Sequence, residues 1–292
     1  MNYSDLITLI LTQLRTHVNS DQFLEQFRRS KAFVRHRKLT LKQVVAYLIY
    51  LKKRSMDIEL SALQRQIPDI EFPDVSRQAV SKARRGILPD LFKELFDEQV
   101  ETVYKHAACS KNWFGYRVFA VDGSTLEIPL SSDTSSEFGT ITSCNNQDIC
   151  WVEGLLSTIY DVFLDQIVDG QIYTKGTGER DPAREHWTRL HELNLAQNAL
   201  LVFDRGYYSK ELYEDLVSDG CHVLMRLNKG NHLTRLGSDD FSWTAASADG
   251  KPVLYRVVRV PLPEQSNEEA EYLVTNITDC LLYTSPSPRD RT

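Results

Sequence analysis

The sequence predicts a mixed α/β fold that is preceded by an all-helical region. Residues 1–112 carry apolar side chains at helical spacing, and no clear strand signal appears before residue 116. Beyond that point the order is strand, hairpin, helix, strand, helix, strand, which is typical of a sheet flanked by helices. With 42% hydrophobic and 25% charged residues, the composition is that of an ordinary globular protein.

Five helices are expected in the first region. Residues 40–51 begin at Thr40, a residue type that caps helix N-termini well. The remaining four are predicted at residues 4–17, at residues 57–66, from Ser76 through RQAVSKARR, and after Pro89 as DLFKELFDEQVETVYKHA.

Charge divides the chain at about the same place. Residues 1–112 hold 19 Lys and Arg against 13 Asp and Glu, whereas the remainder is strongly acidic and brings the whole chain to a net charge of -6. Between Arg28 and Arg54 there are ten basic residues and no acid. Such a patch can contact nucleic-acid phosphates, although a solvated helix face is an equally good interpretation of charge alone.

The pattern changes at Tyr116. RVFAVDGSTLEIP predicts a strand that ends in an acid and a Gly-Ser turn, and residues 151–173 predict two strands joined near Leu164-Asp165. Residues 181–195 predict a helix with Pro182 in its first turn. Further predicted elements are the strand ALLVF, the helix KELYEDLVSDG, and the strands HVLMRL, 252–260 and YLVTNI, with polar, turn-rich residues from 229 to 271.

Two aspartates are the candidate metal ligands. Asp122 follows Val118–Val121 and Asp204 follows Leu200–Phe203, so each would lie at the carboxyl end of a buried strand, where α/β proteins bind ligands. If the strands are neighbours, both carboxylates can share Mg²⁺, and two such ions would clamp the oxygens of an in-line phosphoryl transfer. Alternatively, each Asp only forms a turn or caps a helix.

The motifs FAVDGSTLEIP, LVFDRGYYS, HVLMRL and YLVTNITD together resemble the DDE transposases of bacterial insertion sequences, over roughly residues 30 to 279. DRGY behind an apolar strand is the most specific of them. The resemblance implies a ribonuclease-H-like mixed sheet with flanking helices, preceded by an all-helical N-terminal domain and interrupted by a β-rich insertion. It divides the chain into a helical DNA-binding region (1–112), the core (113–228), the insertion (229–271) and the last core strand (272–279).

Site residues follow from the same resemblance. Asp122 and Asp204 match the first two metal-binding acids, and Arg205 and Tyr207 match positions that hold the structure or the DNA strand. Arg226 matches a basic residue that faces DNA. The segment SRQAVSKARRGI is similar to a helix-turn-helix, in which the DNA-contacting residues would be Arg77, Lys82, Arg84 and Arg85; a solvated helix face is the alternative.

The resemblance also implies cofactors and partners. Two Mg²⁺ ions are expected, with Mn²⁺ as a substitute, and the partner is double-stranded DNA in the form of transposon ends and target. A homodimer would suit work on two DNA ends. We expect a bacterial cytoplasmic location and no membrane association, because no apolar stretch approaches the length of a membrane helix and the amino terminus has no secretory pattern.

A third acid of the family, a Glu on a helix after the LVTN strand, has no counterpart. YLVTNITD is followed by CLLYTSPSPRDRT, which resembles translated adapter DNA, so residues 280–292 are expected to be a non-native tail; a disordered natural terminus is the alternative. Glu268, Glu269 and Glu271 precede the strand and are interpreted as a solvated acidic run. We therefore expect a truncated, inactive fragment, because removing one member of a catalytic set costs orders of magnitude in rate.

Other classes of protein are less well supported. An aspartyl-phosphate phosphatase would need a second Asp where Ser124 stands. A ribonuclease-H-like nuclease would lack the basic helical region and the insertion. A non-catalytic, sequence-specific DNA-binding protein would use the helical region alone and would tolerate Asp122→Ala. Disulfides and zinc sites are not expected, because the five cysteines form no C-x-x-C pair.

Overall fold

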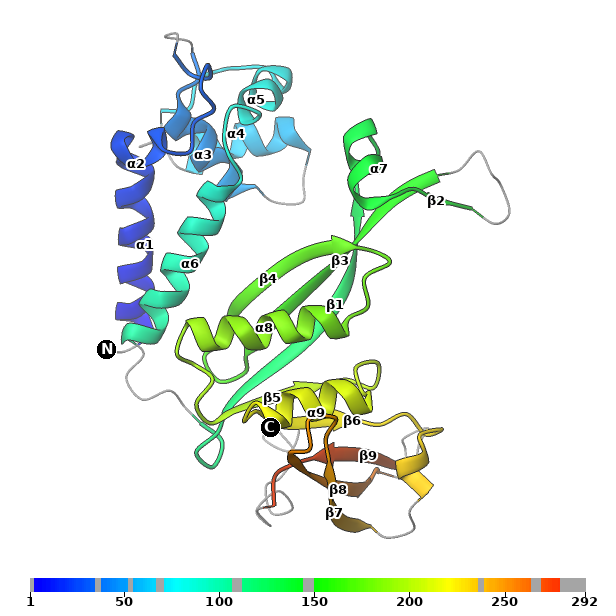
Figure 1. Cartoon of the computed structure of the whole chain (residues 1–292). Coiled ribbons are helices and arrows are strands. Elements are labelled where there is room, and N and C mark those ends of the chain that lie inside the picture. The colour runs from blue at the N-terminus through cyan, green and yellow to red at the C-terminus, as the bar shows by residue number, and fades with distance from the viewer. Residues whose placement is uncertain are drawn as a thin grey trace. The chain divides into compact units, whose positions relative to one another are not determined.

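The computed structural model describes residues 3–34, 38–51, 55–66, 71–106, 112–143, 150–235, 239–263 and 269–278 (Figure 1). The chain forms two compact units, Met1–Cys109 and Ser110–Thr292. Residues 280–292, predicted to be non-native, lie outside the described residues, as does Glu268. None of the described helices has the length and apolar character needed to cross a membrane.

The first unit is helical, as predicted. Its helices are α1 (Tyr3–Asn19), α2 (Asp21–Glu25), α3 (Leu41–Tyr50), α4 (Met56–Gln66), α5 (Arg77–Arg84) and α6 (Asp90–His106). Five of them confirm the predicted segments, and α2 is an additional short helix. Thr40 caps α3 as expected, and Gln43 completes a capping box by bonding back to the Thr40 amide at 3.0 Å.

One apolar core holds this unit together. Val44 and Val45 of α3, Leu63 of α4, Val80 of α5 and Leu91 of α6 are all fully buried and belong to a single cluster. Helix α5 buries only Val80 completely, so most of its surface is left to polar and charged side chains. The short α5 is therefore fixed by the core on one side and free to present charge on the other.

The second unit is built on one sheet. Its strands are β1 (Arg117–Ile128), β2 (Ile141–Thr142), β3 (Cys150–Asp161), β4 (Gln166–Thr174), β5 (Ala199–Phe203), β6 (His222–Arg226), β7 (Asp240–Ala246), β8 (Pro252–Pro261) and β9 (Ala270–Thr275). Its α-helices are α7 (Ser132–Phe138), α8 (Arg180–Glu192) and α9 (Lys210–Ser218). The predicted turn at Leu164-Asp165 is present between β3 and β4, and Asp165 has a positive φ of 56°.

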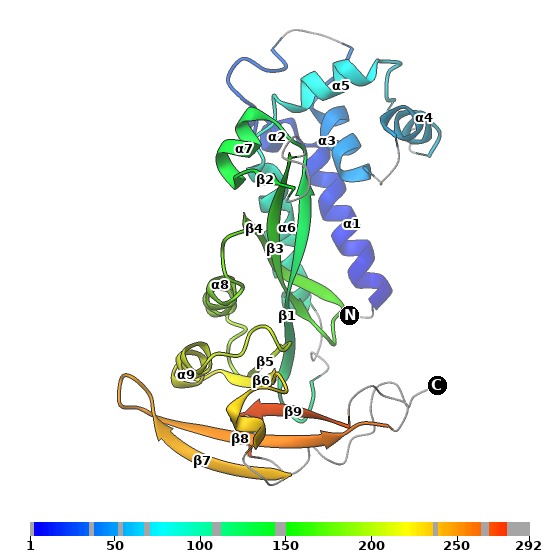
Figure 2. The same ribbon diagram turned by 90° about the vertical axis from the view of Figure 1, so that its right-hand side faces the viewer.

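Strand order confirms the predicted ribonuclease-H-like sheet. β4, β3 and β1 are antiparallel neighbours, β5 and β6 follow parallel to β1, and β9 pairs antiparallel with β6. Helices α8 and α9 pack against each other on one face of the sheet (Figure 2). Beyond β9, β8 and β7 extend the same sheet, so the β-rich insertion adds strands to its edge.

One prediction about β1 was wrong. Gly123-Ser124 does not form a turn after Asp122, because β1 continues to Ile128 and pairs with β3 along this whole stretch, including Gly123 with Ser157. Only the pairing with β5 stops, at Val121 and Phe203. Asp122 therefore lies within a strand, at the point where one of its two neighbours ends.

Helix α7 and strands β2 and β7 were not predicted. β7 reads DFSWTAA and alternates between exposed and half-buried positions, as expected for an edge strand. It carries few of the branched apolar residues that mark a central strand.

A buried polar network attaches α8 to the sheet. His186 Nε2 lies 3.0 Å from Ser157 Oγ on β3, and His186 Nδ1 lies 2.9 Å from Asp169 Oδ2 on β4. The order Ser, His, Asp is that of a hydrolase triad, but Ser157 and His186 are completely buried and Asp169 is nearly so. No substrate can reach the serine in this arrangement, so the three residues serve as a structural anchor.

Candidate active site

Asp122, Asp204 and Arg226 form a row across three neighbouring strands. Val121 of β1 is paired with Phe203 of β5, which is paired with Met225 of β6, and the three polar residues follow these directly. Neighbouring strands are about 4.8 Å apart, and successive side chains alternate between faces. Asp122 and Asp204 are both exposed, and each directly follows one member of the pair Val121 and Phe203.

Arg226 orients the second aspartate. Its Nη1 donates to Asp204 Oδ1 at 3.0 Å, and its Nη2 donates to Glu271 Oε1 on β9. Arg205 Nη2 also lies 3.9 Å from the same Glu271 oxygen. The interpretation of Glu271 as part of a solvated acidic run was therefore wrong, because β9 pairs with β6 and places this Glu beside Arg226. Glu269 is exposed.

Tyr207 supports the loop that follows Asp204. Only 2% of its surface is exposed, its ring lies 5.3 Å from that of Phe203, and its carbonyl accepts from Arg180 Nε at 3.2 Å. Its hydroxyl has no hydrogen-bond partner among the described residues. Burial raises the pKa of Tyr207 well above its usual value, and Glu179, Asp122 and Asp204 raise it further. Of the two expected roles, this geometry favours holding the structure.

Glu179 is an acidic residue at this site that sequence reasoning missed. It immediately precedes α8 in the segment GERDP, yet its side chain does not cap the helix. Instead the carboxylate lies between Gly123 and Gly206, the glycines that follow the two aspartates in β1 and in DRGY. A Cβ added to Gly123 would lie 3.0 Å from Glu179 Oε1, and one added to Gly206 would lie 3.3 Å from Oε2. Only the paired positions of these glycines in space reveal this, because nothing in the local sequence does.

The donor set fits a hard divalent cation. Among the described residues, no three His, Cys, Asp or Glu side chains converge closely enough to enclose a metal ion by themselves. Mg²⁺ does not require this, since it commonly takes one or two carboxylates and completes its shell with water and substrate phosphates. Asp122 and Asp204, exposed on adjacent strands, supply such a pair.

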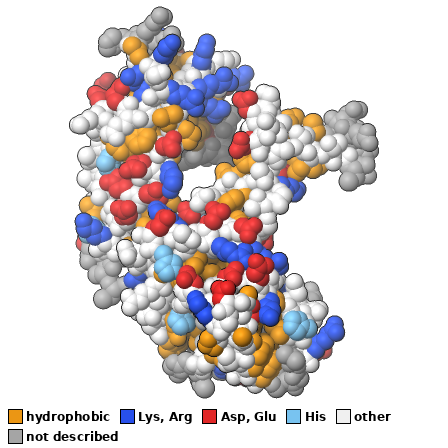
Figure 3. Space-filling view, viewed as in Figure 1, with side chains coloured by type: hydrophobic (Ala, Val, Ile, Leu, Met, Phe, Trp, Pro, Cys, Tyr) orange, Lys and Arg blue, Asp and Glu red, His pale blue; other side chains and the backbone are white. Residues whose placement is uncertain are grey.

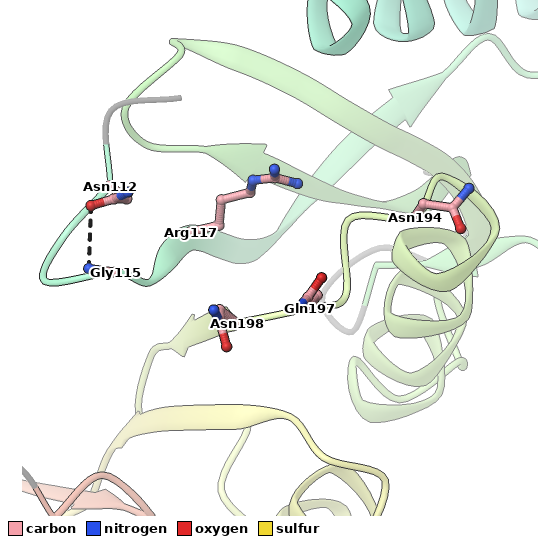
Figure 4. A pocket seen from close by; sticks show the side chains of 6 residues that line it. All are labelled: Asn112, Gly115, Arg117, Asn194, Gln197 and Asn198. Carbon is pink, nitrogen blue, oxygen red and sulfur yellow. Dashed lines mark hydrogen bonds between the residues drawn. The ribbon is translucent and has the colours of Figure 1, made fainter. Parts of the chain in front are cut away.

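A polar pocket of about 260 Å³ lies at the other end of the same strands. Arg117 begins β1 and Asn198 immediately precedes β5, and they line it together with residues of the preceding turns (Figure 4). Asn112 Oδ1 accepts from the Gly115 amide at 3.2 Å, which closes one of these turns. Because Asp122 lies five residues beyond Arg117 in β1 and Asp204 follows the far end of β5, this pocket is separate from the candidate active site.

The helical unit exposes a basic surface. The four residues predicted to contact DNA, which are Arg77, Lys82, Arg84 and Arg85, are all exposed on α5 or directly after it. Arg77 also lies 3.9 Å from Asp57. Lys82 lines a groove together with Lys31 and Lys38, and basic side chains gather over this end of the unit (Figure 3). Five further basic residues of the predicted window lie outside the described residues: Arg35, Arg37, Lys52, Lys53 and Arg54.

Comparison with known proteins identifies a domain family. Residues 113–279, more than half of the chain, match the family described as the transposase DDE domain. A search of the curated proteins gives no match. The matched segment contains both aspartates, Arg226 and all the strands of the sheet.

Solved structures show more distant similarity. A piggyBac transposase in a synaptic complex with hairpin DNA is 10% identical with a TM-score of 0.43, over 94% of this chain and 59% of that one. The Drosophila P element transposase in a strand transfer complex is 10% identical with a TM-score of 0.31, over 72% of this chain and 42% of that one. The catalytic domain of human endonuclease V is 13% identical with a TM-score of 0.27, over 64% of this chain and 82% of that one. The chain thus spans less than two thirds of the piggyBac transposase chain.

Proposed function

The chain belongs to the transposase DDE domain family, and on that premise we propose that its active site serves metal-dependent DNA strand cleavage and strand transfer for an insertion sequence. The observation that carries the proposal is the row of Asp122, Asp204 and Arg226 across three paired strands. Two exposed carboxylates on adjacent strands can hold a divalent ion at a DNA phosphate, and a guanidinium orients one of them.

Each residue of the row has a distinct role in this proposal. Asp122 and Asp204 would hold Mg²⁺ or Mn²⁺, two ions in an intact centre. When bound, the metal activates the attacking oxygen and neutralises charge on the phosphate. Arg226 holds the Asp204 carboxylate through its 3.0 Å hydrogen bond. Arg180 and Tyr207 keep the loop after Asp204 against the sheet, since Arg180 donates to the carbonyls of Tyr207 and Tyr208 at 3.2 Å each.

Double-stranded DNA is the proposed partner. Arg77, Lys82, Arg84 and Arg85 are exposed on and after α5, where they can reach phosphates or bases of a transposon end. Arg205 and Arg226, beside the aspartates, would face the strand being cut. A dimer is the expected assembly, because transposition joins two DNA ends and homo-oligomers are most often two-fold dimers.

We also propose that the chain of 292 residues does not itself cleave DNA. The family resemblance calls for a Glu on a helix after β9, and residues 276–292 contain no Glu. Two acids would bind the metal weakly and leave one side of the reacting phosphate unsupported.

A strand-nicking assay with Mg²⁺ or Mn²⁺ tests the assignment. A chain that continues past residue 279 into a helix carrying a Glu should nick transposon-end DNA, and Asp122→Asn or Asp204→Asn in that chain should abolish nicking. The chain of 292 residues should bind the same DNA without nicking it. Robust cleavage by the 292-residue chain would refute its proposed inactivity, and cleavage that survives both aspartate substitutions would refute the active site.

A non-catalytic DNA-binding protein is the second candidate, and the exposed basic surface around α5 is the observation that favours it. The binding of divalent cations distinguishes the transposase from the non-catalytic DNA-binding protein. A transposase centre should bind Mn²⁺ through Asp122 and Asp204, whereas a protein that uses only its helical unit should bind DNA and show no dependence on either aspartate. The ribonuclease-H-like nuclease would cut DNA without strand transfer.

A further inference from the structure

Glu179 has no structural partner that explains its position. The carboxylate is half-buried, does not cap α8, and makes no hydrogen bond or ion pair with any described residue. Arg180, the next residue, directs its guanidinium to the carbonyls of Tyr207 and Tyr208 and not to this carboxylate. A carboxylate that is partly removed from water without a cation costs free energy.

The backbone around Glu179 leaves room for it. Gly123 and Gly206 approach its two oxygens from either side, and side chains at these positions would come within 3.0 and 3.3 Å of the carboxylate. The Glu179 carboxylate is thereby held on one face of β1 and β5, opposite to the face that their aspartates occupy. By strand alternation Gly123 points to the α8 face and Asp122 to the other face, so the Glu179 charge approaches the centre from the helix side.

Tyr207 provides a second and independent observation. Its hydroxyl is buried without a partner, and a Cβ at Gly123 would lie 3.4 Å from it and 3.0 Å from Glu179 Oε1. The phenol therefore reaches into the space between Glu179 and β1. Three carboxylates, those of Glu179, Asp122 and Asp204, act electrostatically on this one group. Asp204 is paired with Arg226, whereas Glu179 and Asp122 have no basic partner among the described residues, so a bound cation would offset their charge.

We propose that Glu179 is a positioning carboxylate of the cation centre formed by Asp122 and Asp204, whose negative charge strengthens the binding of a divalent ion that it does not touch. This inference rests on the proposed function. Because no three acidic side chains of the described residues converge, Glu179 would act on the ion through space and not as a direct ligand. Groups outside the direct ligand set commonly change metal affinity by about 10- to 100-fold.

Charge and packing roles predict opposite results for Glu179→Gln, which removes the charge and keeps the shape. We expect the Mn²⁺ affinity, measured from the electron paramagnetic resonance signal of free Mn²⁺, to fall about tenfold. We also expect the thermal midpoint in EDTA to rise, because like-charge repulsion is relieved. Lower affinity together with a lower midpoint would indicate a merely structural role and overturn the proposal.

Two control variants accompany Glu179→Gln. Glu192→Gln removes one charge from the other end of α8, where the side chain is 60% exposed and pairs with Arg189, and should leave the Mn²⁺ affinity unchanged. Glu179→Asp keeps the charge and should bind Mn²⁺ within about threefold of the unaltered chain. A tenfold loss in Glu179→Asp would overturn the proposal, even if Glu179→Gln does not fold.

The aspartate variants separate this inference from the proposed function. Asp122→Asn and Asp204→Asn should each abolish Mn²⁺ binding. If they do, and Glu179→Gln binds Mn²⁺ as the unaltered chain does, the role of Glu179 fails and the cation centre stands. If Mn²⁺ binding survives both aspartate substitutions, the cation centre itself fails, and the role of Glu179 fails with it.

Discussion

At the scale of single residues, the candidate site contains both paired charges and a buried polar group without a partner. Arg226 divides its guanidinium between Asp204 and Glu271, so each carboxylate restrains the other through one arginine. The Tyr207 hydroxyl, by contrast, is buried and unsatisfied. An unsatisfied buried polar group costs about 1–3 kcal/mol, and native structures retain few of them.

Replacing this hydroxyl gives the residue-scale prediction. Tyr207→Phe should stabilise the metal-free protein by about 1 kcal/mol, because it removes a buried donor that has no acceptor. Urea unfolding in EDTA measures the free energy of unfolding. Tyr213→Phe is the matched control of opposite sign, since the Tyr213 hydroxyl donates to the Leu254 carbonyl at 2.8 Å and its loss should destabilise the fold. Destabilisation by Tyr207→Phe would mean that the hydroxyl has a partner.

At the scale of elements, α8 links the buried interior to the site. Its first residues, with Glu179 just before them, meet the loop after Asp204, and His186 in its middle is anchored to β3 and β4. Burial by itself would raise the pKa of Asp169, but the hydrogen bond from His186 and its charge lower that pKa below its ordinary value. The anchor therefore stabilises the fold most when Asp169 is ionised.

Acid should weaken this anchor. A carboxyl group whose pKa is lowered on folding contributes stability above its unfolded pKa, about 3.9 for Asp, and loses that contribution as the pH falls through the folded value. The difference in thermal midpoint between the unaltered chain and Asp169→Asn should be largest near pH 7 and shrink below about pH 4. Asp249→Asn, at an exposed position, should show no such trend. A constant difference for Asp169→Asn would contradict the linkage.

At the scale of the whole molecule, two compact units divide the work. The unit Met1–Cys109 has its own buried core and the basic surface around α5, whereas Ser110–Thr292 has the sheet and the acidic centre. The opposite charge of the two halves of the sequence follows this division. In the proposed function, DNA attraction would reside in one unit and cation binding in the other, and this division would explain how a chain of net charge -6 can serve a polyanionic partner.

Separating the units tests this division. A fragment of residues 1–109 should fold cooperatively and bind double-stranded DNA with an affinity that falls steeply with salt, as phosphate contacts require. Replacing both Lys82 and Arg84 by Ala should weaken binding and lower the salt slope by about two. Residues 110–292 should bind Mn²⁺ but little DNA. Fluorescence anisotropy at several salt concentrations gives the DNA affinity and its salt slope. Salt-independent binding would exclude a phosphate interface.

The sequence by itself determined the local structure and part of the site. Helices α1, α3, α4, α5 and α6 were predictable because apolar periodicity and caps are local signals, and Asp122 and Asp204 because each follows an apolar run. Strand β7 was not predicted because, as an edge strand, it lacks an apolar run.

Only the tertiary structure decided which distant residues meet. Pairing with β3 carries β1 past Asp122, and pairing of β9 with β6 places Glu271 on Arg226. A glycine of β1 and a glycine of the loop after β5 approach Glu179. These contacts join residues far apart in the chain, over separations at which sequence periodicity carries no information. Register, and the space left where glycines lack a Cβ, are properties of the assembled sheet, and they complete the site.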